Sequence, residues 1–455
     1  MQSLAGRTIR ASACHAPVRG QLDYLDDALI VIGTDGRIGH VLRQADPEYE
    51  AALGIAEQQE TLVSLPPATV LLPGFVDLHI HAPQYAQLGQ ALDVPLEIWL
   101  GKYTFPLEAR YADLDFARPR YEALVGDLLA NGTTTAVYFA TIHQDATRLL
   151  ADICLDKGQR ALVGKVAMDD PQGCPDYYSD VSAEAAVADT RALIDYIRSH
   201  PGNAAGRVRP VITPRFIPSC TDAALEGLGA LAAECDCHVQ THCSESDWAH
   251  GYGLARFGET DTASLDRFGL LTRKTVLAHS NFITGADMDR LATRGAGVAH
   301  CALSNAYFAG AAFPLRAALA RGVHVGLGTD ISGGPGASML EAQRMAVVTS
   351  RLLESGVDPD LDVAERGRPA SRIDMATAFH LATAGGGEVL DLPIGRFEPG
   401  CHFDAIAVDT AAPEGGIRLF EELPPLDLLE KLINTASRAN IAAVWVDGRL
   451  VAGTA

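Results

Sequence analysis

The chain has 455 residues, of which 48% are hydrophobic and 20% are charged, a composition typical of a large soluble globular protein. Its formal net charge of −21 argues against a nucleic-acid partner, because phosphate binding needs a basic surface, and favours a small neutral substrate. No apolar run approaches the roughly 20 residues of a membrane span, the first residues lack the apolar core of a signal peptide, and no cysteines form a C-x-x-C pair. We therefore expect a cytoplasmic protein with free thiols and no membrane partner.

The two ends of the chain are predicted to form β-strands. Alternating apolar runs occur at Ala28–Ile32, Asp404–Val408 and Ala442–Val446, and the Gly and Pro residues around them suit hairpins. We predict that residues 1–70 and 396–455 meet in one small β-sandwich domain.

Between the ends, eight short apolar runs alternate with segments of helical pattern such as Ser182–Ser199 and Thr221–Cys235. The runs are Leu71–His81, Thr133–Thr141, Arg160–Met168, Arg207–Phe216, Cys237–Glu245, Lys274–Ser280, Gly295–Cys301 and His324–Asp330. Near-continuous apolar character is what strands buried on both faces require, so the pattern predicts an α/β fold, a (β/α)8 TIM-like barrel over residues 71–395. Glu354–Arg372, rich in Pro, Asp and Gly, is predicted to be a surface loop.

The first of these runs ends in His79-Ile80-His81. Alternate residues of a strand point to the same side, so both imidazoles can reach one metal ion. His242 lies near the end of the fifth run and Asp330 ends the eighth, and barrel enzymes build their sites at the carboxyl ends of strands. We predict that His79, His81, His242 and Asp330 bind one divalent cation, with Zn²⁺ preferred and Fe²⁺ compatible with the same ligands. Strand alternation points Cys243 away from this site.

Three residues near the predicted metal have the chemistry of acid–base catalysts. Glu245, three residues after His242, is not needed as a ligand and is predicted to shuttle protons. His279 ends the sixth run and is predicted to hydrogen-bond a metal-bound hydroxide, while Asp330 also takes a proton from the bound water. Hydrolytic deamination needs such a set, because water loses a proton, a ring nitrogen gains one, and one must reach the departing amine.

The ordered set His-x-His, His, His and Asp on a barrel resembles the amidohydrolase superfamily. The His-x-x-Glu pattern after the fifth strand resembles its mononuclear aminohydrolase branch, because the binuclear branch has a carboxylated lysine at the end of the fourth strand. Here that strand ends in Arg215-Phe216, and Lys165 on the third is predicted to be structural. Within the superfamily, the chain resembles the guanine deaminases over about residues 65–410. The segments that carry this resemblance are Phe75–Tyr85, Lys102–Pro106, Asn131–Thr135, Tyr138–His143, Gly164–Val166, Thr213–Phe216, Gly326–Asp330 and Gly395–Glu398.

The resemblance implies hydrolysis of guanine to xanthine and ammonia in purine catabolism, by a homodimer. It also implies that Gln84, Arg215 and Phe216 bind the purine. Arg donates to a ring carbonyl, Gln offers a donor and an acceptor, and Phe stacks on the base. A ring with an amine in place of the carbonyl would leave Arg215 as an unpaired buried charge. Ser280 and Ala302 depart from the family, which commonly has glycine and proline at these positions.

Three other functions remain open at this point. A deaminase of another aminoheterocycle, such as a pterin, 8-oxoguanine or a triazine, would keep the chemistry and change the ring. A cyclic-amide hydrolase is less favoured, because Glu245 is present and the lysine on the fourth strand is absent. A non-catalytic binding scaffold is disfavoured by the complete ligand set.

Overall fold

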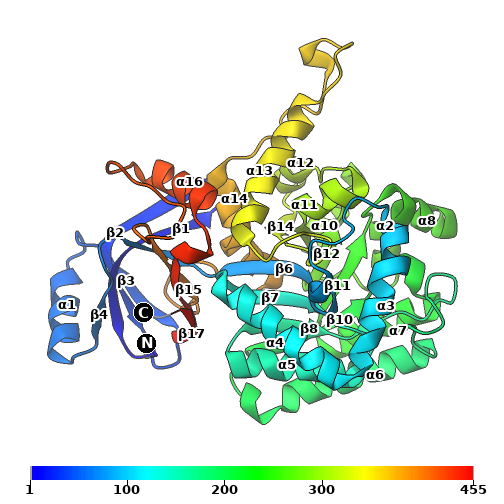
Figure 1. Ribbon diagram of the computed structural model, residues 1–455, viewed down its shortest axis with the longest axis horizontal. Helices are drawn as coiled ribbons and strands as arrows, with labels where there is room; N and C mark the ends of the chain where they lie inside the picture. Colours follow the sequence, from blue (N-terminus) through cyan, green and yellow to red (C-terminus); the bar gives the residue numbers. More distant parts are fainter. Residues whose placement is uncertain (1–2, 454–455) are drawn as a thin grey trace.

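The computed structural model describes residues 3–453, which form a parallel barrel beside a second, curled sheet (Figure 1). The barrel strands lie in the order β14-β13-β12-β11-β10-β8-β7-β6, each parallel to its neighbours, and the short β9 pairs with β10. These strands are β6 (Phe75–His81), β7 (Thr133–Phe139), β8 (Arg160–Gly164), β9 (Val166–Ala167), β10 (Val208–Pro214), β11 (His238–Cys243), β12 (Thr275–His279), β13 (Gly297–His300) and β14 (His324–Leu327).

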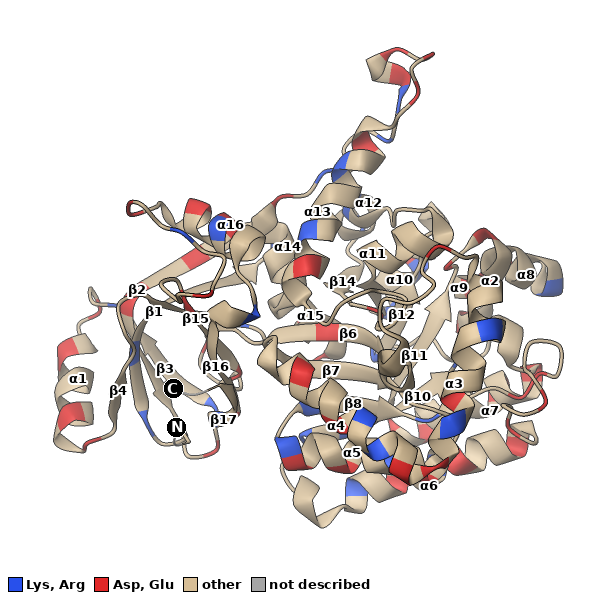
Figure 2. Cartoon of the chain, in the orientation of Figure 1, with Lys and Arg blue, Asp and Glu red and all other residues tan. Residues whose placement is uncertain are grey.

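Two backbone hydrogen bonds bring the ends of the first and last barrel strands together. The N–H of His81 donates to the carbonyl of Ile331 at 2.7 Å, and the N–H of Asp330 donates to the carbonyl of His79 at 2.9 Å. The predicted (β/α)8 barrel is thus confirmed, and its carboxyl ends include the predicted ligands. Most of the barrel strands carry no charged residues (Figure 2), as burial on both faces requires.

One predicted strand is divided between the two sheets. The run Leu71–His81 separates into β5 (Thr69–Pro73), which pairs with the strands of the chain ends, and β6 of the barrel. The break falls at Gly74, where an added Cβ would lie 2.1 Å from Oγ1 of Thr134. Only a glycine lets the backbone pass so close to the neighbouring strand, and a continuous apolar run does not reveal this constraint.

Helices surround the barrel, and the two predicted helical segments are confirmed. Ser182 caps α6 by accepting from the N–H of Ala185 at 3.2 Å, and Thr221 caps α7 by accepting from the N–H of Ala224 at 3.2 Å. The helices of this part of the chain are α2 (Leu96–Trp99), α3 (Phe105–Ala109), α4 (Leu114–Ala130), α5 (Gln144–Lys157), α6 (Ala183–Ser199), α7 (Asp222–Cys235), α8 (Asp247–Phe257), α9 (Asp261–Arg267), α10 (Gly285–Arg294), α11 (Ala302–Ser304), α12 (Leu315–Ala320), α13 (Met339–Ser355), α14 (Met375–Ala382) and α15 (Ala384–Leu390).

The chain ends form the second sheet, whose strand order is β17-β16-β15-β5-β1-β2-β3, with β4 paired to β1. Its strands are β1 (Thr8–Val18), β2 (Gln21–Ile32), β3 (Ile38–Leu42), β4 (Leu62–Ser64), β5, β15 (Ala405–Asp409), β16 (Ile441–Val446) and β17 (Arg449–Gly453), accompanied by α1 (Tyr49–Gln58) and α16 (Pro425–Thr435). The sheet curls around a separate apolar core that contains Phe403 and Trp445, both fully buried. The predicted β-sandwich of the chain ends is confirmed in this curled form.

A buried ion network joins the barrel to the sheet of the chain ends. Nε of Arg160, at the start of β8, donates to Oδ2 of Asp404 at 3.0 Å, and its Nη2 donates to Oδ1 of Asp447 at 2.6 Å. Asp447 also accepts from Arg207 at 3.0 Å and lies 2.6 Å from Nδ1 of His402. Burial alone would raise the pKa of Asp447, but the hydrogen bond from His402 and the charge of Arg160 outweigh it and hold the pKa well below its ordinary value.

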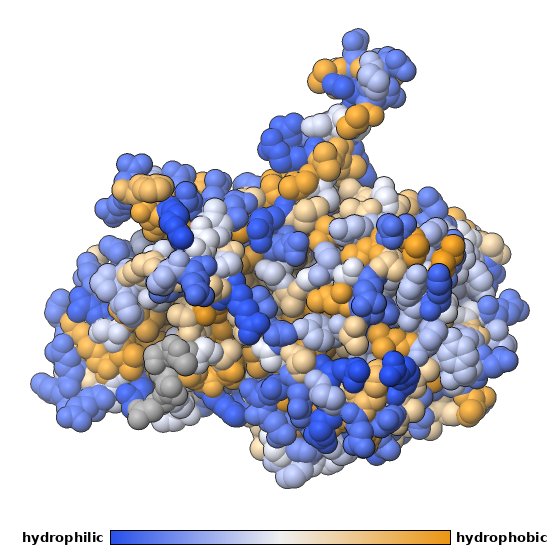
Figure 3. Space-filling model, viewed as in Figure 1, coloured by the Kyte–Doolittle hydropathy of each residue, from blue (hydrophilic) through white to orange (hydrophobic). Residues whose placement is uncertain are grey.

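The segment after α13 extends away from the barrel (Figure 1), as the predicted surface loop Glu354–Arg372 suggested. Val357 and Val363 are 88% and 77% exposed there, and apolar atoms are visible along this projection in Figure 3. Within residues 3–453, none of the helices combines the length and the apolar composition that crossing a lipid bilayer requires.

The Asp447 network predicts a pH-dependent stability. A carboxyl whose pKa is lower in the folded than in the unfolded chain stabilises the fold above its unfolded pKa of about 3.9, and this stabilisation is lost as the pH falls. Asp447→Asn removes the charge and leaves Arg160 without one of its buried partners, so it should lower the free energy of unfolding by about 3 kcal/mol at neutral pH. The carboxyl of the folded chain stays ionised well below pH 4, so urea titrations should show a clearly smaller loss only near pH 2. An equal loss at pH 7 and pH 2 would mean that the charge of Asp447 is not responsible.

Candidate active site

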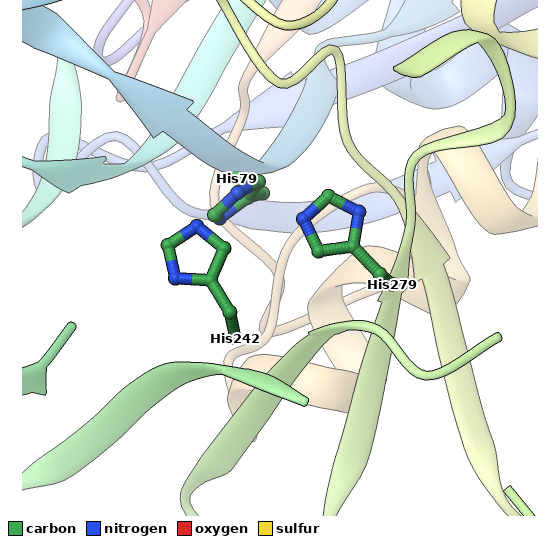
Figure 4. Close-up of side chains that lie close together, drawn as sticks. All are labelled: His79, His242 and His279. Carbon is green, nitrogen blue, oxygen red and sulfur yellow. The ribbon is translucent and has the colours of Figure 1, made fainter. Parts of the chain in front are cut away.

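Three imidazoles from β6 and β11 and a carboxylate from the segment after β14 converge at the carboxyl end of the barrel. Nε2 of His79 lies 3.2 Å and Nε2 of His81 lies 3.7 Å from Oδ1 of Asp330, and Nε2 of His81 lies 2.9 Å from Nε2 of His242. All four residues are at most 8% exposed. Figure 4 shows the rings of His79, His242 and His279 gathered around one volume. The four predicted metal ligands are therefore brought together.

The surroundings of the imidazoles fit a cation. Burial is the first cause that lowers the pKa of His79, His81 and His242 well below the ordinary value, so these rings are neutral, the form that binds metal. Nδ1 of His242 donates to the carbonyl of Arg215 at 2.6 Å, which leaves the lone pair of its Nε2 facing the cluster. Nε2 of His79 has no hydrogen-bond partner among the described protein atoms. The donor set suits one divalent cation.

The predicted acid–base residues lie at the same point. Nε2 of His279 is 3.6 Å from Oε1 of Glu245 and 3.9 Å from Oδ2 of Asp330. Nδ1 of His279 donates to Oδ1 of Asn305 at 2.9 Å, so its Nε2 lone pair faces the two carboxyls. Burial, followed by the charge of Asp330, raises the pKa of Glu245 to about 8. A carboxyl with this pKa can hold a proton at neutral pH, and a nearby bound cation would favour its release.

Asp77 holds the two ends of the ligand set in place. It is fully buried on β6, accepts from the N–H of Thr329 at 3.0 Å and from its hydroxyl at 2.6 Å, and also accepts from the N–H of His79 at 3.3 Å. Thr329 precedes Asp330, so one carboxyl group links the first histidine ligand to the carboxylate ligand. This role was not predicted, because an aspartate within an apolar strand has no distinguishing spacing.

A pocket opens directly beside the metal-type cluster. It is lined by His81, Gln84, Leu96, Trp99, Leu100, Arg215, Phe216, His242, Glu245, Phe308, Asp330 and Gly333. The predicted substrate residues Gln84, Arg215 and Phe216 are all among them. Trp99 and Phe308, whose ring centroids lie 5.0 Å apart, were not predicted, because they come from short helical segments outside the strand ends. Apolar and aromatic walls with a few convergent polar groups are typical of a small-molecule site.

Glu108 on α3 was also missed, and it changes the interpretation of Arg215. The Nη1 of Arg215 donates to Oε2 of Glu108 at 2.7 Å, and its Nη2 donates to Oε1 at 3.1 Å. Arg215 is 2% exposed and Glu108 is fully buried, so the prediction that a mismatched ring would leave Arg215 unpaired is wrong. The family motif ended at Pro106, two residues before Glu108, and spacing gave no sign of a partner 107 residues from Arg215.

Lys165 and Cys243, two residues set aside from the site, have other partners. The Nζ of Lys165 is 2.5 Å from Oδ1 of Asp180, and both side chains are buried. The Sγ of Cys243 lies 3.4 Å from Oγ1 of Thr262, on the outer side of β11. All nine cysteines of the chain are free.

The backbone at the site is strained at several strand ends. His279, Ser280 and Asp330 have φ angles of 68°, 56° and 54°, in the left-handed region that favours glycine. Such strain at functional positions is maintained by the surrounding structure. At Ser280 a glycine would adopt this conformation without the cost that serine bears.

Comparison with known proteins places the chain in a family. The sequence pattern of the amidohydrolase family matches residues 70–451. The chain belongs to the amidohydrolase family. It is 39% identical over 446 residues to a probable guanine deaminase of Schizosaccharomyces pombe, and the alignment covers 96% of this chain and 82% of that protein.

Two solved structures are similar along almost the whole chain. The guanine deaminase of C. acetobutylicum with bound guanine has a TM-score of 0.85 at 29% identity, covering 98% of this chain and 99% of the other. An adenosine deaminase from xanthomonas campestris with bound zinc has a TM-score of 0.80 at 26% identity, covering 98% and 92%. The predicted membership in the guanine deaminase branch of the superfamily is confirmed by these matches.

Ser280 allows a test of the strained strand end. Its hydroxyl has no partner among the described protein atoms, so Ser280→Gly removes both the left-handed strain and a buried unpaired group. These gains exceed the extra chain entropy that glycine loses on folding, and we expect the free energy of unfolding to rise by about 1 kcal/mol. Ser280→Ala is the matched control, because it removes the hydroxyl and keeps the strain. Urea midpoints should rank Ser280→Gly above Ser280→Ala; the reverse order would contradict the strain.

Proposed function

We propose that this protein hydrolyses guanine to xanthine and ammonia. The observation that supports it best is one pocket whose lining includes the metal-type residues His81, His242 and Asp330 together with Gln84 and Arg215. The matches to guanine deaminases point to the same reaction. We infer that the ligand is a flat heterocycle with a carbonyl and an amine.

We propose zinc as the cofactor, with one ion per chain. Three neutral imidazoles and one carboxylate form the kind of set that holds a catalytic zinc with an open position, and Fe²⁺ accepts the same ligands. His79, His81, His242 and Asp330, which lie close together, would hold it. When bound, the cation supplies a water that ionises near neutral pH. The homodimer and the cytoplasmic location stay predictions.

The residues around the cluster divide the proton transfers of the reaction. Asp330, 3.9 Å from His279, accepts a proton as the attacking water adds to the ring carbon that bears the amine. Glu245, with its raised pKa, holds a proton and delivers it to the neighbouring ring nitrogen. His279, fixed by Asn305, accepts a hydrogen bond at Nε2 and orients the water. Asp330 then passes its proton to the amine, and the C–N bond breaks to release ammonia as the added oxygen becomes a carbonyl and returns its proton to Glu245.

The pocket walls fix which ring enters and how it lies. Arg215 presents donors to the ring carbonyl, and Gln84 offers an amide edge beside it. Phe216 is 5% exposed, with its ring centroid 6.1 Å from that of His242, so a base that stacks on it lies against the reacting side of the pocket.

A pterin carries the same amino-oxo edge as guanine, so among the alternative substrates it suits this pocket best. The pocket offers no observation that favours a triazine or a cyclic amide. Ammonia release from guanine, 8-oxoguanine, pterin, adenine, cytosine and a triazine would decide among them, and the highest kcat/KM should be for guanine.

Glu245→Gln tests the proton-shuttle role. The amide keeps the shape of the side chain but cannot exchange a proton, so turnover of guanine should fall about 10² to 10⁴ fold. Bound metal, measured by elemental analysis, should stay at the level of the native protein because Glu245 is not among the four proposed ligands. His79→Ala is the contrasting variant and should lose both metal and activity. Loss of metal from Glu245→Gln would instead make Glu245 a ligand.

We expect Arg215 to determine the choice between guanine and adenine. Adenine has an amine where guanine has the carbonyl, so Arg215 would face a donor and the binding of the ring would lose a hydrogen bond. We expect adenine to be a very poor substrate. Arg215→Met should raise KM for guanine or lower kcat/KM without changing the metal content. Equal rates of ammonia release from both purines on the native protein would remove Arg215 as the selector.

A further inference from the structure

Glu108 lies behind the substrate pocket and contacts both polar residues of its recognition wall. It lies one residue before the end of the short helix α3, is fully buried, and is not among the residues that line the pocket. It accepts two hydrogen bonds from Arg215, at 2.7 and 3.1 Å, and one from Nε2 of Gln84 at 2.7 Å. One carboxylate therefore holds the two groups proposed to recognise the ring.

Glu108 fixes the orientation of the Gln84 amide. The carboxylate can only accept, so the amide nitrogen of Gln84 must face it. On the other side, the N–H of Ser332 can only donate, and it lies 3.3 Å from Oε1 of Gln84. Two partners of opposite and fixed polarity thus exclude the flipped amide. Gln84 keeps one N–H and one lone pair for a ligand in a defined order along the pocket wall.

Glu108 also compensates the charge of Arg215. Burial alone would lower the pKa of Arg215, but the charge and hydrogen bonds of Glu108 outweigh it and raise the pKa above its ordinary value. The guanidinium also lies over the ring of Phe105, with its carbon 4.9 Å from the ring centroid. The cation is therefore held in place from behind, and a ligand meets donors whose positive charge is balanced by a carboxylate at hydrogen-bond distance.

We propose that Glu108 is a positioning residue that sets the charge class of the substrate. By balancing Arg215 and orienting Gln84, it makes the wall complementary to a neutral amino-oxo heterocycle and unfavourable to an anionic one. The inference rests on the proposed function for the identity of the ring. The dependence of binding affinity on the charge of the ligand is a property of the pocket itself, so it can be measured without turnover.

Glu108→Gln tests this with two purine probes, hypoxanthine, which is neutral, and urate, which is an anion at neutral pH. The variant leaves Arg215 as an uncompensated cation beside the pocket, so the affinity for urate relative to hypoxanthine should rise about tenfold in calorimetric titrations. The KM for guanine should rise more than kcat falls, because recognition and not the proton transfers is disturbed. An unchanged urate-to-hypoxanthine ratio would overturn the proposal.

Three further variants separate charge from structure. Asp404→Asn breaks another fully buried arginine–carboxylate pair, with Arg160, away from the pocket, and should leave the ratio unchanged. Glu108→Asp keeps the negative charge but places it farther from Arg215. It should therefore raise KM for guanine without raising the affinity for urate relative to hypoxanthine. If Glu108→Gln alone does not fold, the double variant Glu108→Gln with Arg215→Met replaces it. In Arg215→Met alone, Glu108 is a buried anion without its cation, and the double variant removes that anion. The affinity for urate relative to hypoxanthine should therefore be about tenfold higher in the double variant than in Arg215→Met.

The outcomes distinguish this inference from the proposed function. If the native protein releases no ammonia from guanine while the urate-to-hypoxanthine ratio shifts as expected, the substrate is wrong and the role of Glu108 stands. If guanine is deaminated but neither Glu108→Gln nor the double variant changes the ratio, Glu108 only supports the fold and the inference is wrong.

Discussion

Four buried metal-type donors sit within a few ångströms of one another at the carboxyl end of the barrel, and the rest of the site is arranged around this constraint. The side chains of His79, His81, His242 and Asp330 are removed from water, and desolvation keeps the imidazoles neutral. Three of the four residues are tied to groups outside the cluster, either directly or through a neighbouring residue. Asp77 holds the His79 and Asp330 ends, and the carbonyl of Arg215 holds His242.

The carbonyl of Arg215 also couples the metal-type cluster to the recognition wall. The residue accepts from His242 with its backbone and donates to Glu108 with its side chain, so a single strand end positions a ligand and a substrate group together. Glu108 then extends this network to Gln84. A chain of hydrogen bonds in a dry pocket is rigid because leaving any buried member unpaired is costly. This rigidity suits a reaction in which the ring must present one carbon to the attacking water.

The sequence predicted the parts of this structure that rest on short-range patterns. Apolar runs and His79-Ile80-His81 gave the barrel and the side on which its ligands lie, because strand alternation and the parallel topology are local rules with few exceptions. Ser182 and Thr221 marked two helix starts for the same reason. The division at Gly74 was missed, since it depends on the close approach of Thr134, a residue of the neighbouring strand. Glu108, Asn305 and Trp99 were missed because their roles arise only from contacts distant in sequence.

The proposed chemistry depends on one cation per chain acting with residues already in place. Titration of the metal-free protein with Zn²⁺, followed by ammonia release from guanine, measures this stoichiometry directly. We predict that activity rises linearly and stops at one equivalent, because His79, His81, His242 and Asp330 converge at a single point. A rise that continues to two equivalents, or full activity in the chelated protein without added metal, would contradict the account.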